Sequence, residues 1–348
     1  MTFLAGDLGG TKTLLALFSR DGTVLHRRRL ASADYPTCEA LLEDFLTGLQ
    51  PAPKPQCFVL GVAGPVLTEG PRTVCDITNL RYRVDAQVLQ ARLGCPVSLV
   101  NDFYAAAGAV AVLAQGDTFS GLSLAPLRPV GSSTAQPGAP LAVLGAGTGL
   151  GEACVLMHQG ATVILPSEGG HTDFAPGDEV EVRLHRYLSR RYPDHVSWER
   201  VLSGAGIVTL YEFFRDELHV PEEPVVAQQL GQHPDGAEVI SHHALAGSCA
   251  LCSMALSRFV LLLGAEAGNL ALKTLSRGGV FLAGGIAAKN LPFFQNRAFR
   301  ERFARKGRFE QLLNTFPLHV VVGEDLGLCG AATLAQKQLG EAAFAAVV

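Results

Sequence analysis

The chain has 348 residues, which is long for one compact core, so two domains are expected. Hydrophobic residues make up 48% of the chain and charged residues 17%, the ordinary balance of a globular protein. The formal net charge of -4 excludes a basic excess, so neither nucleic acid nor an anionic membrane is expected as a main partner.

The first predicted elements are two strands joined by a glycine-rich turn. The strand 3–5 leads into Gly6-Asp7-Leu8-Gly9-Gly10-Thr11-Lys12-Thr13, and the strand 14–18 leads out of it. Asp21-Gly22 predicts a hairpin, followed by a third strand over 23–30. The chain opens on a strand without the features of a secretion signal, and no apolar run reaches the roughly 20 residues that cross a bilayer. We therefore expect a cytoplasmic protein with no membrane contact.

Helices and buried strands alternate through the next part of the chain. Its predicted elements are a helix over 39–49, strands over 57–62 and 97–100, and a helix from Asn101 or Asp102 to Leu113. Residues 115–140 are rich in Gly, Ser and Pro, which is typical of a long connection near a domain boundary.

The opening pattern then returns. A strand over 141–144 leads into the turn Gly145-Ala146-Gly147-Thr148-Gly149-Leu150-Gly151, and two strands follow at 153–157 and 161–165. The elements predicted after them are helices over 179–192, 206–218 and 238–275, the last as two helices meeting near Gly264, strands over 279–283 and 319–322, and a C-terminal helix from about Leu328.

These elements predict an α/β fold with two similar lobes and a cleft between them. We expect residues 1–113 and 328–348 to form a small α/β lobe, and residues 114–327 to form a large α/β lobe with added helices.

The two glycine-rich turns fit neither common nucleotide motif. A P-loop requires Gly directly before Lys and a helix after it, but Thr11 separates Gly10 from Lys12 and a strand follows. A dinucleotide fingerprint requires a sixth-position glycine, where Leu150 or Glu152 stands instead.

A pair of phosphate-binding hairpins fits better. Glycine at a hairpin tip lets backbone N–H groups approach an anion closely, and two such hairpins could hold a polyphosphate from two sides. Thr11 and Thr148 would add hydroxyl donors, and Asp7 would supply a carboxylate near a magnesium ion. The alternative is two ordinary tight turns, with Lys12 as a solvated side chain.

Asp102 has two interpretations of equal weight from the residues alone. It could be a general base that accepts a hydroxyl proton, or it could cap the helix that begins there. Asn101 could serve as the cap instead and leave Asp102 free.

Taken together, the motifs resemble the bacterial glucokinases of the actin-like ATPase and sugar kinase superfamily, over nearly the whole chain. The matching segments are Gly6 to Thr11, Val100-Asn101-Asp102-Phe103, Gly145 to Gly151, Leu165 to Pro176, Arg200 to Gly204, Ala283-Gly284-Gly285-Ile286, Lys306-Gly307-Arg308-Phe309 and Gly327 to Gly330. The resemblance implies a duplicated, ribonuclease H-like fold with an interdomain cleft, and transfer of the ATP γ-phosphate to the 6-hydroxyl of glucose.

The resemblance also implies roles for particular residues. Asp102 matches the catalytic base, and the sugar-binding positions are Thr78, Asn79, Asn101, Asp102, Glu168, His171 and Glu199. The ATP-binding positions are Asp7, Gly9, Gly10, Thr11, Lys12, Gly147, Thr148, Gly149, Gly284 and Gly285, with Asp7 also on the Mg²⁺ side. A homodimer is expected from the family.

The sequence departs from the family pattern at one sugar-side position, because Tyr82 stands where a Trp is usual. A sister group carries a cysteine-rich zinc motif after its equivalent of His171. Here the next close pair is Cys249 and Cys252, which we interpret as small buried residues of one helix, without structural zinc.

Three functions stay open at this point: a glucokinase, a kinase for another hexose or an amino sugar, and a sugar-responsive regulator on the same fold. An intact Asp102, and few residues before Gly6 to hold a DNA-binding helix pair, make the regulator the least favoured. The residues do not separate ATP from polyphosphate or ADP as the phosphoryl donor.

Overall fold

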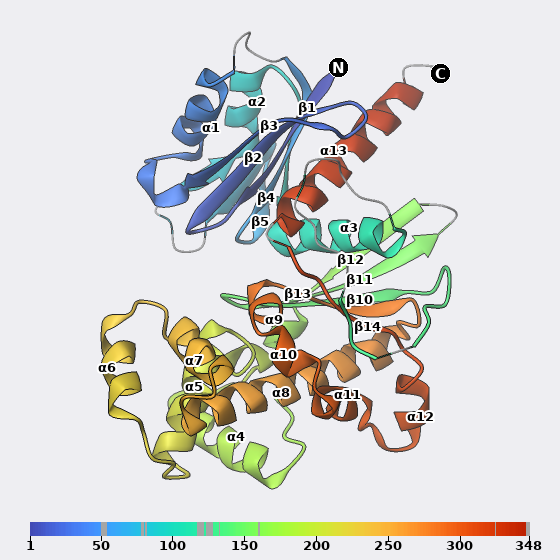
Figure 1. The fold of residues 1–348 in the computed structure, drawn as a ribbon. Coiled ribbons are helices and arrows are strands. Elements are labelled where there is room, and N and C mark those ends of the chain that lie inside the picture. The colour runs from blue at the N-terminus through green and yellow to red at the C-terminus, as the bar shows by residue number, and fades with distance from the viewer. Residues whose placement is uncertain are drawn as a thin grey trace. The chain divides into compact units, whose positions relative to one another are not determined.

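The computed structural model describes residues 1–49, 54–77, 80, 82–116, 122, 128–131, 133–158, 161–323 and 325–345. The chain divides into two compact units (Figure 1). The N-terminal unit comprises Met1–Ala125 with Gly323–Val348, and the central unit comprises Pro126–Val322.

The N-terminal unit is built on a five-stranded sheet in the order β3-β2-β1-β4-β8. Its strands are β1 (Thr2–Leu8), β2 (Lys12–Ser19), β3 (Val24–Ala31), β4 (Pro55–Val62) and β8 (Val97–Asn101). β2 is antiparallel to both of its neighbours, β1 and β3, and β4 and β8 run parallel to β1. The glycine-rich turn 9–11 joins β1 to β2.

Helices cover both faces of this sheet, which explains its nearly continuous apolar strands. Successive side chains of a strand point to opposite faces. Leu4 and Leu8 therefore pack in one cluster with α1 (Cys38–Thr47) and α2 (Ala86–Leu93), and Phe3 and Ala5 pack in another with α3 (Asp102–Ala114) and α13 (Leu326–Ala345) (Figure 1).

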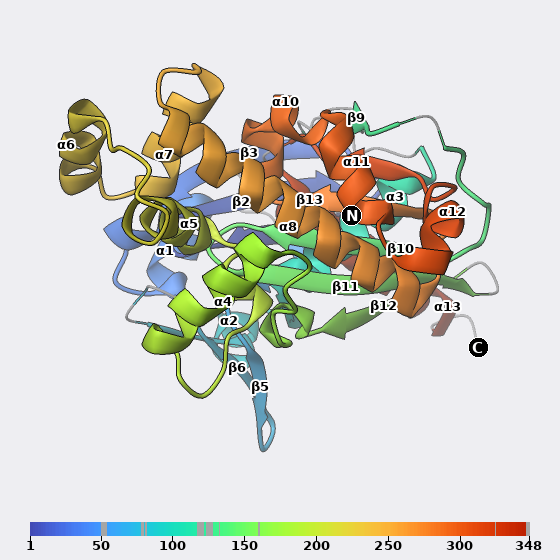
Figure 2. The ribbon, with the colours of Figure 1, turned by 90° about the horizontal axis from the view of Figure 1, so that it is seen from below.

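A small antiparallel sheet in the same unit was not predicted. Its strands are β5 (Val66–Glu69), β6 (Arg72–Asp76) and β7 (Arg83–Asp85), and Figure 2 shows β5 and β6 as a projecting hairpin. The strands of this small sheet are short and polar, so no buried apolar run in the sequence indicated them. Elsewhere in the unit, the short 3₁₀ turn η1 (Ser32–Asp34) follows β3.

The central unit repeats the sheet pattern. The six-stranded order is β12-β11-β10-β13-β14-β9, formed by β9 (Arg128–Pro129), β10 (Leu141–Ala146), β11 (Leu150–His158), β12 (Ala161–Ser167), β13 (Gly279–Ala283) and β14 (Leu318–Val320). As in the other unit, three antiparallel strands are followed by two parallel ones. The predicted duplication is confirmed, and β9 is an added edge strand where a connection was expected.

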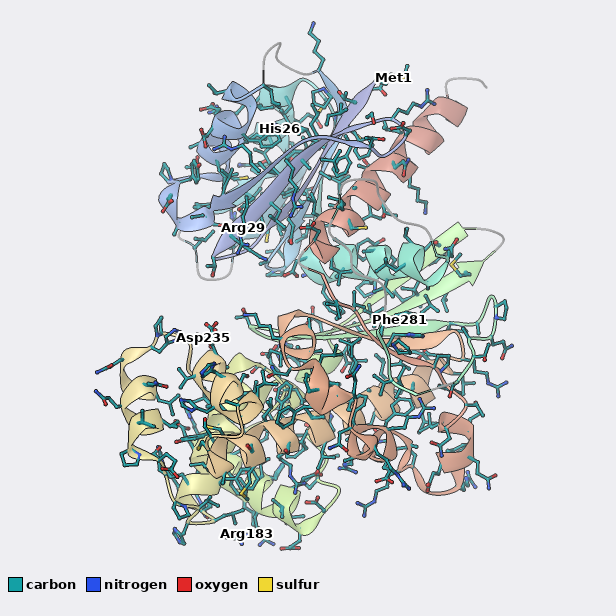
Figure 3. All side chains as sticks on the ribbon, viewed as in Figure 1. Met1, His26, Arg29, Arg183, Asp235 and Phe281 are labelled. Atoms are coloured by element: carbon teal, nitrogen blue, oxygen red, sulfur yellow. The ribbon has the colours of Figure 1, made fainter. Side chains whose placement is uncertain are left out.

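The remaining elements of the central unit are mostly helical. They are α4 (Glu179–Arg191), α5 (Gly204–Asp216), α6 (Pro224–Gln232), α7 (Gly236–Leu245), α8 (Ala250–Thr274), α9 (Gly285–Lys289), α10 (Leu291–Phe294), α11 (Arg297–Ala304), α12 (Glu310–Leu313), and the 3₁₀ turns η2 (Gly169–His171), η3 (Trp198–Arg200) and η4 (Gly307–Phe309). On the sheet, Phe281, which Figure 3 labels, stacks on the ring of His319. Their ring centroids are 5.1 Å apart.

Helix α8 is the central helix of this unit. Its length and composition would also suit a membrane span, but 67% of its apolar window is buried inside the protein. It packs against α5, α7 and α11 (Figure 2). Its apolar character is therefore accounted for by the core that it forms.

The predicted break near Gly264 is wrong. The two helices separate at residues 246–249, where Gly247 has a φ of +63°. Gly264 lies inside α8, where a Cβ would come 3.0 Å from the carbonyl oxygen of Phe299. That glycine serves the close packing of α8 against α11 rather than a turn.

The crossing of α3 and α13 yields a stability prediction. A Cβ on Gly330 would overlap the carbonyl oxygen of Ala105, whereas a Cβ on Gly340 of the same helix would meet nothing within 4 Å. Gly330→Ala should lower the free energy of unfolding by about 1–3 kcal/mol through overpacking. The control Gly340→Ala should raise it by about 0.5–1 kcal/mol. Urea unfolding measures both, and equal effects would contradict this account of the crossing.

Candidate active site

Ser32 forms two hydrogen bonds to the backbone of the first glycine-rich turn. The Gly9 N–H donates to the Lys12 carbonyl (3.0 Å) and closes the turn. The Ser32 hydroxyl donates to the Gly9 carbonyl (2.7 Å), and the Ser32 N–H donates to the Thr11 carbonyl (3.1 Å). Thr11 remains exposed at the tip. The sequence contained no signal for the part that Ser32 plays.

Asp7 is the second-to-last residue of β1, close to this turn, and other carboxylates lie near it. Burial, with the charges of Asp102 and Asp325, raises the pKa of Asp7 to about 6, while Lys12 opposes that rise. A Cβ on Gly327 would lie 2.5 Å from the Asp7 carboxyl carbon, so a side chain there would displace the carboxyl group. A divalent cation bound at Asp7 would reduce the repulsion between these carboxylates.

Asn101 caps helix α3. Its side-chain oxygen accepts from the N–H groups of Phe103 (2.9 Å) and Tyr104 (3.2 Å), and its amide donates to the Gly64 carbonyl (3.3 Å). Asp102 is therefore not required as the cap, although one of its oxygens also accepts from the Phe103 N–H (2.8 Å). Burial raises the pKa of Asp102, and the Phe103 N–H acts against that rise.

The second glycine-rich turn, in the central unit, is connected to Glu199. The Gly147 N–H donates to the Gly149 carbonyl (2.9 Å), and Thr148 is exposed at the tip. The Leu150 N–H donates to a carboxylate oxygen of Glu199 (3.0 Å). A Cβ on Gly149 would lie 2.5 Å from that same oxygen. The absence of a side chain at Gly149 therefore lets Glu199 reach the turn.

The segment Glu168 to His171 places two exposed polar side chains around two buried glycines. A Cβ on Gly169 would overlap the Glu152 carboxyl, and one on Gly170 would overlap the Leu150 carbonyl oxygen. The Gly169 N–H donates to the Ser167 hydroxyl (2.9 Å). Because the two glycines pack directly against β11, the backbone of this segment is held in place. The side chains of Glu168 and His171 project from it.

Backbone hydrogen bonds join η2 to η3. The Trp198 N–H donates to the Thr172 carbonyl (3.1 Å), and the Phe174 N–H donates to the Val196 carbonyl (2.9 Å). The buried Trp198 ring meets Phe174 edge-on at 5.0 Å. Glu168, His171, Glu199 and the 147–149 turn are thereby gathered around the start of β11.

Gly284 and Gly285 lie beside the second turn. Strand β13 pairs with β10, with Ala283 opposite Gly145. Gly284 has a φ of +88°, and a Cβ on it would come 2.5 Å from the Ala146 carbonyl oxygen. A Cβ on Gly285 would meet nothing within 4 Å. The surface at the start of α9 is therefore open.

Some predicted features lie elsewhere. Thr78 and Asn79 are outside the described residues, so the structure does not place them. Tyr82 packs against the core of the N-terminal unit, with its hydroxyl buried. Cys249 and Cys252 are buried at the start of α8, where the Cys249 sulfur accepts from the Cys252 N–H (3.4 Å).

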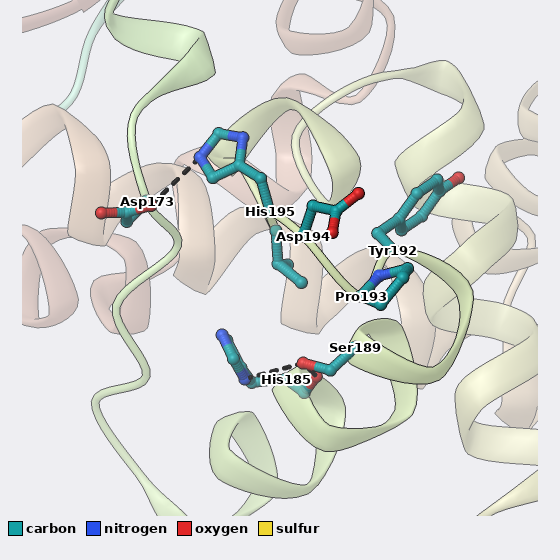
Figure 4. Close-up of a pocket in the computed structure, with 8 residues that line it drawn as sticks. Asp173, His185, Ser189, Tyr192, Pro193, Asp194 and His195 are labelled. Atoms are coloured by element: carbon teal, nitrogen blue, oxygen red, sulfur yellow. Dashed lines mark hydrogen bonds and ion pairs between the residues drawn. The ribbon is translucent and has the colours of Figure 1, made fainter.

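A polar pocket of about 190 Å³ lies beside the segment that follows His171 (Figure 4). It contains an ion pair between His195 and Asp173 (3.1 Å) and a hydrogen bond between Ser189 and His185 (3.3 Å). None of the predicted site residues that the structure describes lines it. Within the described ranges, no group of three or more His, Cys, Asp or Glu side chains is arranged to hold a metal ion.

Comparison with known proteins places the chain in a family. The glucokinase family model matches residues 4–338. A glucokinase of Nostoc punctiforme is 38% identical over 351 residues, covering 96% of this chain and 98% of the relative. The crystal structure of a glucokinase from an Antarctic psychrotroph matches with a TM-score of 0.78 and 28% identity, covering 97% of this chain and 99% of that one.

A more distant structure shares the fold. The glucokinase of Streptomyces griseus, solved with glucose and AMPPNP, matches with a TM-score of 0.62 and 20% identity, covering 97% of this chain and 100% of that chain. The predicted actin-like, two-domain α/β fold is confirmed by these matches. The chain belongs to the bacterial glucokinase family of sugar kinases, enzymes that phosphorylate glucose.

Proposed function

We propose that this glucokinase transfers the γ-phosphate of ATP to the 6-hydroxyl of glucose, with Asp102 as the general base. The observation that carries the proposal is the capping of α3 by Asn101, which leaves Asp102 available at the positive end of that helix. The Asp102 carboxylate accepts the hydroxyl proton while the sugar oxygen bonds to the γ-phosphorus and ADP departs. A late proton transfer of this kind needs only a positioned carboxylate.

The sugar-binding residues in the proposal are Glu168, His171 and Glu199, with Asn101, Thr78 and Asn79. Support comes from the fixed backbone of the 168–171 segment and from its hydrogen bonds to the Glu199 segment. A carboxylate accepts hydrogen bonds from sugar hydroxyls, and an imidazole can donate or accept one. Asn101 can add the second N–H of its amide, because the first donates to the Gly64 carbonyl and the oxygen is used by the helix. Thr78 and Asn79 are included on the family resemblance alone.

The ATP phosphates are assigned to the two glycine-rich turns. Gly9, Gly10, Thr11 and Lys12 supply one set of donors, and Gly147, Thr148 and Gly149 supply the other. Gly284 and Gly285 leave room for adenosine. The AMPPNP bound by the Streptomyces griseus relative supports a nucleotide as the donor.

Magnesium fits the crowded carboxylate of Asp7. The ion usually keeps several waters and takes one or two protein carboxylates together with substrate phosphates. When bound, it would neutralise charge that develops on the phosphates. A homodimer is proposed from the family resemblance alone, and a cytoplasmic location stays a prediction from the sequence.

The sugar is tested by ADP release in the presence of magnesium with glucose, fructose and N-acetylmannosamine. Glucose should give the highest kcat/KM. Equal or better turnover of another sugar would instead support the second candidate, a kinase for another hexose or an amino sugar. Absence of turnover with every sugar would point to a non-catalytic regulator.

The base is tested by Asp102→Asn. We expect kcat to fall by a factor of at least about 10². Glucose binding should change far less, because Asn101 still caps the helix. Glucose binding can be followed by the fluorescence of Trp198, the single tryptophan of the chain. Asp34→Asn, at an exposed position of the same unit, controls for the loss of one charge. Near-normal turnover of Asp102→Asn would exclude Asp102 as the base.

The second turn is tested by two neighbouring glycines. In Gly147→Ala the new methyl group fits the fold but would obstruct a phosphate, so the KM for ATP should rise with little change in glucose binding. In Gly149→Ala the methyl group displaces Glu199, so glucose binding should weaken as well. Indistinguishable kinetic effects in the two variants would refute this division of roles.

A further inference from the structure

Two carboxyl groups without a role in the proposed reaction are buried behind the 168–171 segment. Glu152 of β11 is 2% exposed, and Glu266 of α8 is 0% exposed. The two carboxyl groups lie within hydrogen-bonding reach of each other. In each carboxyl group the oxygen Oε1 is buried. Among the described residues, no N–H or hydroxyl group donates a hydrogen bond to it. Two carboxylates in contact away from water cannot both be ionised, so one proton is shared within the pair.

The surroundings favour the charged form at Glu266. Its Oε2 accepts from the Asn269 amide (2.7 Å), and the Lys273 ammonium lies 3.9 Å from its Oε1. Lys306 donates to the Asn269 side-chain oxygen (2.5 Å) and to the Ala265 carbonyl (2.9 Å). The proton therefore resides on Glu152. Burial, together with the neighbouring Glu266, raises the pKa of Glu152 to about 8.

Glu152 also supports the segment that carries Glu168 and His171. Its Oε2 occupies the space that a Cβ of Gly169 would fill. On the sheet it pairs across from Ser167, whose hydroxyl accepts from the Gly169 N–H (2.9 Å). A change of charge at Glu152 would therefore act directly on the backbone of η2.

We propose that Glu152 is a positioning residue for glucose binding: protonated, it donates to Glu266 and supports Gly169, and loss of that proton displaces the 168–171 segment and weakens glucose binding at alkaline pH. The proposal rests on the assignment of Glu168 and His171 to the sugar. Glu152 itself need not touch glucose. Its effect is expected in the affinity for glucose rather than in the phosphoryl transfer step.

Other charged groups near the pair must be separated from Glu152. Lys273 belongs to α8, and Lys306 follows α11. Burial lowers the pKa of Lys306 to about 8, with Arg302 lowering it further and Glu266 and Glu181 opposing this. Lys306 and Glu152 therefore titrate in the same pH range, and only a variant at Glu152 distinguishes them.

The experiment measures the Kd for glucose without nucleotide, by Trp198 fluorescence, from about pH 6.5 to about pH 9.5. If binding requires neutral Glu152, the wild-type Kd should rise about tenfold per pH unit well above its pKa. In Glu152→Gln the amide still donates to Glu266 but has no proton to lose, so the Kd should not rise. Glu238→Gln, at an exposed position of α7, should behave as wild type.

A wild-type Kd that stays constant over this range overturns the proposal. So does a rise in Glu152→Gln equal to that of the wild type, which would assign the effect to Lys306. If Glu152→Gln does not fold, Glu266→Gln is measured instead. Removing the negative charge of Glu266 should shift the pH at the midpoint of the rise in Kd. An unchanged midpoint overturns the proposal. Absence of glucose binding at every pH would instead contradict the proposed function.

Discussion

Close packing that is possible only where a residue lacks a Cβ is the constraint on which the candidate site depends. In the central unit, Gly169 and Gly170 lie directly on β11, and Gly149 lets the Glu199 carboxylate reach the second turn. In the N-terminal unit, Gly327 leaves space for Asp7. A methyl group at Gly149 or Gly327 would displace a carboxylate that the proposed reaction uses, and one at Gly169 or Gly170 would displace the segment that carries Glu168 and His171.

The duplicated sheet explains why each unit presents such a site at the same place. In both units an antiparallel pair, β1–β2 or β10–β11, is joined by a glycine-rich turn, and a parallel strand follows beside its first member. The first strand of each pair therefore ends where the turn exposes backbone N–H groups. The units differ in what stands beside the turn: Asp7 and the start of α3 in one, and η2, η3 and the start of α9 in the other.

Carboxyl groups that lie near one another occur in both units. In the N-terminal unit the charge of Asp102 raises the pKa of Asp7, and in the central unit the charge of Glu266 raises the pKa of Glu152. In both cases burial raises the pKa, because a charge loses its hydration away from water. Asp7 has surroundings suited to a cation, whereas Glu152 and Glu266 are enclosed and can be satisfied by a proton. Chemically similar pairs are thus suited to different ligands.

The sequence by itself determined the α/β class, the duplicated strand–turn–strand pattern and the glucokinase family, because apolar periodicity and glycine motifs are local properties of the chain. It also marked Glu168 and His171 through an unusual pair of glycines. Only the tertiary structure decided that Asn101 caps α3, that Gly264 packs inside α8, and that Ser32 and Glu152 support segments distant in sequence. The contacts of Gly264, Ser32 and Glu152 join residues far apart in the chain, and the cap of α3 depends on which of two adjacent side chains turns toward the helix N–H groups. Neither spacing nor composition specifies which side chain takes these places.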